Sequence, residues 1–148
     1  MTHRCLTLSV DDHDAARALY AVLSTGETPT DTRASLSAFK ALLSHEGTRV
    51  IGALKDDRIV SMATLHILPN MTNGARAYAL IENVATLPGF TRQGFGRAVM
   101  QSAIDTAWTA GAYKIMLLTG RRNDALKFYQ KLGFDAGDKH ALVLRHEF

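Results

Sequence analysis

The feature that most limits what this chain can fold into is a glycine-bearing turn between an extended run and a helix. Residues 75–86 form an extended, largely apolar run, whereas after Gly94 the apolar residues recur at helical spacing as far as Gly111. The turn between them contains Gly89, Gly94 and Gly96. Unpaired backbone N–H groups at such a helix start carry the positive end of the helix dipole, and glycine lets an anion approach them. The segment therefore predicts a strand, an anion site and a long helix in succession.

The remaining elements follow from apolar spacing and from the turn residues between them. Polar turns at 55–57 and 69–74 separate three extended runs, which favours an antiparallel meander. The uninterrupted apolar run 115–118 indicates a strand buried on both faces. We expect strands over 6–10, 48–54, 58–68, 75–86, 113–119 and 141–148, and helices over 12–23 (capped by Asp11 or Asp12), 31–46, 95–110 and 123–132. This order, β-α-α-β-β-β-α-β-α-β, predicts an α/β fold with a mixed, mostly antiparallel central sheet flanked by helices.

Length and composition indicate one domain. The chain has 148 residues, 47% of them hydrophobic and 21% charged, which suits a single domain over residues 1–148. No stretch approaches the roughly 18 consecutive apolar residues that a membrane span requires. The single cysteine, Cys5, excludes an internal disulfide framework and agrees with a reducing compartment. We therefore expect a soluble, cytoplasmic protein with no membrane partner.

Charge and histidine spacing exclude two further classes of partner. The formal charge is +3, and Lys and Arg are spread along the chain, so we do not expect a nucleic-acid partner. A phosphate-rich small ligand accounts for the same excess of positive charge. The six histidines show no metal-ligand spacing, so we expect no metal.

Two familiar phosphate motifs do not fit the glycine turn. A dinucleotide fingerprint needs a third glycine at position 99, which is Val99, and an acid about twenty residues on, where Lys114 stands. A Walker A loop needs Gly-Lys-Ser/Thr, which the segment lacks. Taken alone, the segment is also compatible with a helix entered through a flexible glycine turn.

With its surroundings, the segment resembles the coenzyme A pyrophosphate loop of GNAT acetyltransferases, Gln/Arg-x-x-Gly-x-Gly/Ala. Residues 91–96, Thr-Arg-Gln-Gly-Phe-Gly, match both glycines, while Thr91 replaces the usual first residue. The resemblance extends over about residues 76–136. It implies a GNAT fold, acetyl-CoA as co-substrate, and a pyrophosphate held by backbone N–H groups of Arg92, Gln93, Gly94, Phe95, Gly96 and Arg97. It also implies that Val84, Ala85 and Thr86 pair with the pantetheine arm, and that Asn123 either contacts that arm or caps a helix.

The same resemblance suggests residues for proton transfer. Tyr129 is similar to the family's general acid, which protonates the departing thiolate, although its apolar stripe also fits a buried core tyrosine. Glu82 shares a strand face with Leu80 and Val84, and a carboxylate among apolar neighbours can serve as a general base, directly or through water. A structural ion pair is the other interpretation of Glu82. His66 is a weaker candidate for the base.

The resulting hypothesis is direct transfer of acetyl from acetyl-CoA to a primary amine in a ternary complex, with a small-molecule acceptor favoured. The alternatives are a protein acetyltransferase that modifies an N-terminus or a lysine, and a non-catalytic acyl-CoA-binding module. A homodimer is common in the family, and the sequence has no motif that identifies the acceptor.

Overall fold

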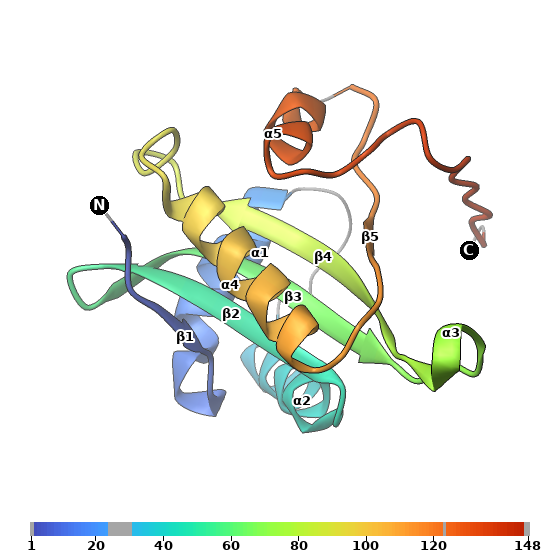
Figure 1. Ribbon diagram of the computed structural model, residues 1–148. Coiled ribbons are helices and arrows are strands. Elements are labelled where there is room, and N and C mark those ends of the chain that lie inside the picture. Colours follow the sequence, from blue (N-terminus) through green and yellow to red (C-terminus); the bar gives the residue numbers. More distant parts are fainter. Residues whose placement is uncertain (1, 24–30, 123, 147–148) are drawn as a thin grey trace. The chain divides into compact units, whose positions relative to one another are not determined.

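The computed structural model describes residues 2–23, 31–122 and 124–146 (Figure 1). The chain divides into two compact units, one ending at Leu117 and the other beginning at Leu118. No helix of the described ranges is long and apolar enough to cross a bilayer.

The first unit is built on one five-stranded sheet with the order β1-β2-β3-β4-β5. Neighbouring strands are antiparallel from β1 to β4, whereas β4 and β5 are parallel. The strands are β1 (Cys5–Thr7), β2 (Thr48–Lys55), β3 (Arg58–Leu68), β4 (Tyr78–Thr86) and β5 (Ile115–Leu117). The predicted mixed, mostly antiparallel sheet is confirmed.

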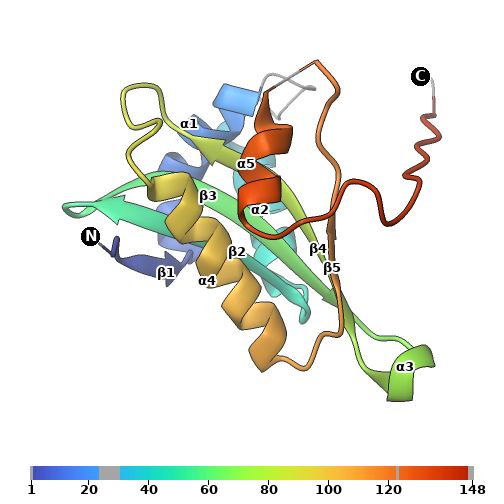
Figure 2. The same cartoon turned by 45° about the horizontal axis from the view of Figure 1, so that its top comes forward.

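Helices cover both faces of this sheet. Figures 1 and 2 show α4 on one face and the helices α1 and α2 on the other. The described helices of this unit are the 3-10 turn η1 (Val10–Asp12), α1 (His13–Leu23), α2 (Thr32–Ser44), the short α3 (Thr72–Ala75) and α4 (Phe95–Thr109). The side chains between the layers are fully buried on both sides, among them Leu19 of α1, Val60 and Leu65 of β3, and Val99 and Met100 of α4. Each such side chain contributes roughly 1.5–3 kcal/mol through burial.

Helix starts follow local capping chemistry. The second helix begins at Asp31 as predicted, and Asp31 caps it, with its carboxylate accepting from the Arg33 N–H at 3.0 Å. The predicted Asp11 or Asp12 cap of the first helix is wrong. Ser9 caps the 3-10 turn instead, and its own N–H donates to the Asp12 carboxylate at 2.7 Å. This turn includes Val10, so β1 ends at Thr7 and not at residue 10 as the sequence predicts.

The second unit contains α5 (Ala125–Lys131) and a C-terminal segment without regular structure. The predicted last strand is wrong over residues 141–146, where Leu142 and Leu144 are 93% and 100% exposed. Its last two residues lie outside the described ranges. Alternating apolar residues become a strand only where a neighbouring strand takes their hydrogen bonds and a core covers one face.

The strand expected over 113–119 is also shorter than predicted. It is reduced to β5, and Met116 at its centre is 38% exposed. The prediction of burial on both faces is therefore wrong. Because β5 lies at the end of the sheet order, only β4 pairs with it among the described strands.

Candidate active site

No described strand pairs with one side of the β4 backbone along its second half. The parallel ladder joins residues 79–81 of β4 to residues 115–117 of β5 and ends at the pair Ile81 and Leu117. The described strands contribute no partner on that side for residues 83–86. This stretch contains the predicted pantetheine residues Val84, Ala85 and Thr86. An extended ligand arm can add there as a further strand, hydrogen-bonded to backbone groups.

A β-bulge interrupts β4 at the same place. Thr64 of β3 pairs with Glu82, whereas Met62 pairs with Ala85, so one residue of β3 faces two residues of β4. One of these two is Asn83, which has φ 54°, in the left-handed region that Asn tolerates better than most residues.

The bulge reverses the inward and outward alternation of β4. Thr64 and Met62 are two residues apart and face the same way, so their partners Glu82 and Ala85 share a face. Val84 therefore does not share the face of Glu82. The prediction that it does is wrong, because simple alternation does not register the inserted residue.

The glycine turn is held in a fixed shape ahead of α4. The Gln93 side-chain amide donates to the Gly89 carbonyl at 2.7 Å and closes the turn. Arg92 and Gly94 have φ values of 58° and 89°. Gly94 occupies the N-cap of α4 without a side-chain cap, so the N–H groups of the first helical turn have no capping side chain. These are the donors that the sequence predicts for an anion.

The N-terminal segment supports this turn through a residue that the sequence analysis missed. The His3 ring nitrogen Nε2 lies 2.8 Å from the Gln93 carbonyl oxygen, and the ring stacks on Phe95 at a centroid distance of 3.9 Å. The Phe95 side chain is 1% exposed, so the helix start is anchored in the core. A Cβ on Gly94 would approach His3 Nε2 to 3.3 Å. His3 lies 90 residues from Gln93 in the sequence, and no local sequence pattern predicts the contact between them.

Two cations flank the turn. Arg92 and Arg97 are both exposed. Neither forms an ion pair with any residue in the described ranges. Their guanidinium groups therefore remain available to an anion at the helix start.

Glu82 is half-buried on the sheet face that bears Thr64. Its side-chain carboxylate has no ion pair and no hydrogen bond with the rest of the described chain. The structural ion pair considered for this carboxylate is therefore not formed with the described residues. His66 lies two residues beyond Thr64, on the same face of β3, and its Nδ1 is 2.9 Å from the Thr48 hydroxyl. Both candidate bases are thus placed on one side of the sheet.

Tyr129 lies on α5 in the second unit. It is 9% exposed, and its ring makes edge contacts with Phe128 and Phe134 at centroid distances of 5.1 and 6.2 Å. This packing fits both interpretations of the residue, so its role as general acid stays a prediction. Asn123 lies outside the described residues.

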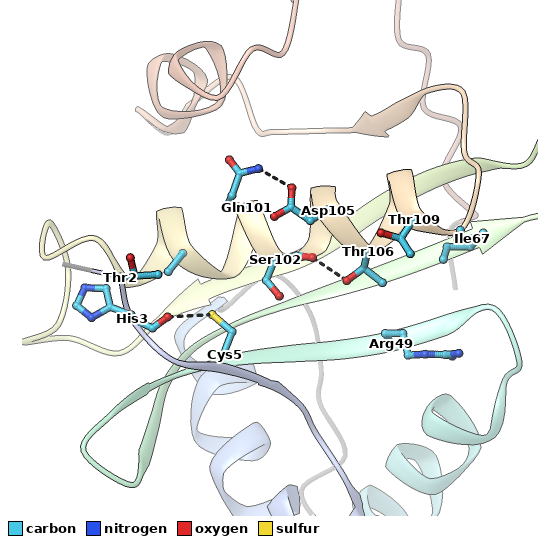
Figure 3. Close-up of a pocket in the computed structure, with 12 residues that line it drawn as sticks. Thr2, His3, Cys5, Arg49, Ile67, Gln101, Ser102, Asp105, Thr106 and Thr109 are labelled. Carbon is cyan, nitrogen blue, oxygen red and sulfur yellow. Dashed lines mark hydrogen bonds between the residues drawn. The ribbon is translucent and has the colours of Figure 1, made fainter.

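The first unit also has a cavity of about 600 Å³, which lies along α4 and the N-terminal segment (Figure 3). Its lining includes Cys5, Arg49, Ser102 and Thr106, but not Glu82. The opened edge of β4 and the helix start therefore define a candidate site apart from this cavity. No group of three or more metal-ligating side chains occurs among the described residues.

Comparisons with known proteins identify the family of the chain. Residues 16–134 match the sequence model of the Acetyltransferase (GNAT) family. A glucosamine 6-phosphate N-acetyltransferase of Trypanosoma brucei brucei is 35% identical over 92 residues, which are 62% of this chain and 61% of that protein. The match thus spans less than two thirds of that relative's length.

Solved structures match over nearly the whole chain. An acetyltransferase-like protein of Agrobacterium tumefaciens str. C58 is 37% identical, with a TM-score of 0.90 over 97% of this chain and 99% of that one. A Trypanosoma brucei acetyltransferase is 27% identical, with a TM-score of 0.82 over 98% and 99% of the two chains. Since the family match covers most of the chain and the fold agrees, the protein belongs to the GNAT family of acetyltransferases.

Proposed function

We propose that the protein is an acetyl-CoA-dependent N-acetyltransferase that acts on a primary amine of a small molecule. The observation that carries the proposal is the edge of β4 that no described strand pairs with beyond Ile81. This edge contains a bulge, and the strand is followed by the start of α4, where Gly94 is the N-cap. An extended arm with a diphosphate at one end suits such an edge followed by a helix N-terminus.

In this proposal the cofactor binds mainly to backbone groups. The pyrophosphate accepts hydrogen bonds from N–H groups of residues 92–97, and Arg92 and Arg97 add positive charge. The pantetheine arm pairs with residues 84–86. Asn123 keeps its two predicted roles, a pantetheine contact or a helix cap.

The chemistry requires two proton transfers. The amine nitrogen attacks the thioester carbonyl carbon, a C–N bond forms, and the C–S bond breaks to release CoA thiolate. Glu82 accepts the amine proton, directly or through water, and Tyr129 donates a proton to the thiolate sulfur. His66 is the second candidate for the base because it lies on the same sheet face.

The acetyl group passes directly to the amine in a ternary complex. Cys5 is the only cysteine in the sequence. Burial raises the pKa of the Cys5 thiol, which keeps it protonated and poorly nucleophilic at neutral pH. This supports a mechanism without an acetyl-cysteine intermediate.

The acceptor is proposed from the relative that is named for its activity on glucosamine 6-phosphate. An amino sugar phosphate is therefore the first acceptor to try. A peptide amine as acceptor, or acyl-CoA binding without turnover, would be alternative outcomes. A cytoplasmic location and a homodimer belong to the same proposal.

Acetyl-CoA should raise the melting temperature, because a ligand that binds only the folded state stabilises it by about 2.7 kcal/mol at a hundredfold excess over its dissociation constant. Gly96→Val should abolish most of this shift, since a side chain at the first turn of α4 obstructs the approach of the pyrophosphate. Differential scanning fluorimetry checks both results.

The matched control is Ser102→Val, which adds a β-branched side chain later on the same helix and should keep the shift. NAD and ATP should have much smaller effects on the wild-type protein. Equal shifts from all three ligands, or a full acetyl-CoA shift in Gly96→Val, would place the phosphates elsewhere.

A further inference from the structure

His3 contacts the glycine turn from a distant part of the sequence and constrains one of its peptide groups. Its ring nitrogen Nε2 lies 2.8 Å from the Gln93 carbonyl oxygen. A carbonyl oxygen can only accept a hydrogen bond, so Nε2 carries the proton and donates it. Both the neutral Nε2–H form and the imidazolium ion of His3 can make this contact. The Gln93 carbonyl is therefore held toward the His3 ring.

Aromatic packing fixes the position of the His3 ring. The ring stacks on Phe95 at a centroid distance of 3.9 Å and an interplanar angle of 26°. Phe90, at the other end of the turn, makes an edge contact with Phe95 at 6.1 Å, and the Arg58 guanidinium lies 5.4 Å from the centre of the Phe90 ring. Both ends of the turn are thus anchored by packing, and His3 joins one anchor to the peptide that follows Gln93.

The direction of the Gln93 carbonyl sets the direction of the next N–H group. In a trans peptide the carbonyl and the N–H of the following residue point in opposite directions, so the Gly94 N–H points away from His3. Gly94 is the N-cap of α4 and has φ 89°. Because glycine adopts either sign of φ at little cost, this peptide group could rotate if nothing held it. A rotated peptide would turn a carbonyl oxygen, and not an N–H group, toward a bound anion.

We propose that His3 is a positioning residue for the cofactor, whose hydrogen bond keeps the peptide between Gln93 and Gly94 in the orientation that presents the Gly94 N–H to the pyrophosphate. This inference rests on the proposed function. His3 acts through the backbone and takes no part in proton transfer. Removing its N–H donor should therefore weaken the binding of acetyl-CoA and leave the rate of the chemical step unchanged.

Two variants of His3 separate its N–H donor from its packing. His3→Phe keeps an aromatic ring to stack on Phe95 but has no N–H group, and it should raise the Kd and the KM for acetyl-CoA by about tenfold. His3→Gln has an amide N–H at a similar distance from the backbone and should recover part of the affinity. In both variants kcat at saturating acetyl-CoA should stay near the wild-type value. Calorimetric titration and steady-state kinetics measure these quantities.

Thr2→Ala is the matched control, because Thr2 is the exposed neighbour of His3 in the same segment, and this variant should bind acetyl-CoA as the wild-type protein does. Wild-type affinity in His3→Phe, even with a lowered melting temperature, would overturn the inference and assign His3 a structural role alone. An affinity in His3→Gln as low as in His3→Phe, or an equal loss in Thr2→Ala, would also overturn it. These outcomes leave the proposed function standing, whereas a wild-type protein that binds no acetyl-CoA would contradict the proposed function itself.

Discussion

Replacing Tyr129 by Phe should lower kcat by about 100-fold and leave the affinity for acetyl-CoA near that of the wild-type protein. Phe keeps the ring that packs against Phe128 and Phe134, so the fold of the second unit should be preserved. What is lost is the phenolic proton that, in the proposed mechanism, neutralises the departing CoA thiolate. Steady-state kinetics with a fixed acceptor, together with calorimetric titration of acetyl-CoA, measure the two quantities.

Tyr113→Phe is the control for this change. Tyr113 is a half-buried tyrosine whose ring faces Arg76 and Lys114, and it has no part in the proposed chemistry. Its variant should react at the wild-type rate. Full activity in Tyr129→Phe would assign Tyr129 to the core of its unit and leave protonation of the thiolate to water.

Glu82→Gln should also lower kcat by about 100-fold, because the amide is nearly the same size but cannot accept the amine proton. The described part of the chain gives Glu82 no ion pair to lose, so the melting temperature should stay close to that of the wild-type protein. Measuring kcat and the melting temperature of the same preparation separates loss of the base from loss of structure.

The double variant Tyr129→Phe, Glu82→Gln should have a lower kcat than either single variant. The reason is that an acid and a base that act on different atoms should each contribute to the barrier. An unchanged rate in Glu82→Gln would shift the role of base to His66, which lies on the same face of β3. In that case His66→Gln should show the loss.

The sequence predicts well those elements whose ends are marked by local chemistry. The predicted helix start at Asp31 and the run from Gly94 to Gly111 locate α2 and α4 to within a few residues. The candidate anion-binding turn is recognisable for the same reason, because its glycines and the following helix are adjacent in sequence. Its geometry needs the positive φ values that the structure shows at Arg92 and Gly94.

Features that depend on distant partners are not visible in the sequence. The bulge at Asn83 changes which residues share a face with Glu82, yet the only local hint is an Asn, which tolerates a left-handed backbone. The His3 contact with the turn joins the chain start to residue 93.

The predicted strand at the C-terminus failed for a related reason. Residues 141–146 alternate as a strand does, but a strand exists only with a neighbour, and the described chain does not supply one. Alternation of apolar residues therefore predicts only that a segment can form a strand, and a neighbouring strand decides whether it does.

Mass spectrometry of the products is the most direct test of the proposed transfer of acetyl from acetyl-CoA to a small amine. The protein is incubated with acetyl-CoA that carries an isotope-labelled acetyl group and with a panel of amines that begins with glucosamine 6-phosphate. We predict one labelled N-acetyl product, an equal amount of free CoA, and intersecting double-reciprocal plots when both substrates are varied. Stable binding of acetyl-CoA with no labelled amine from any member of the panel, or label retained on Cys5 with parallel plots, would contradict the account.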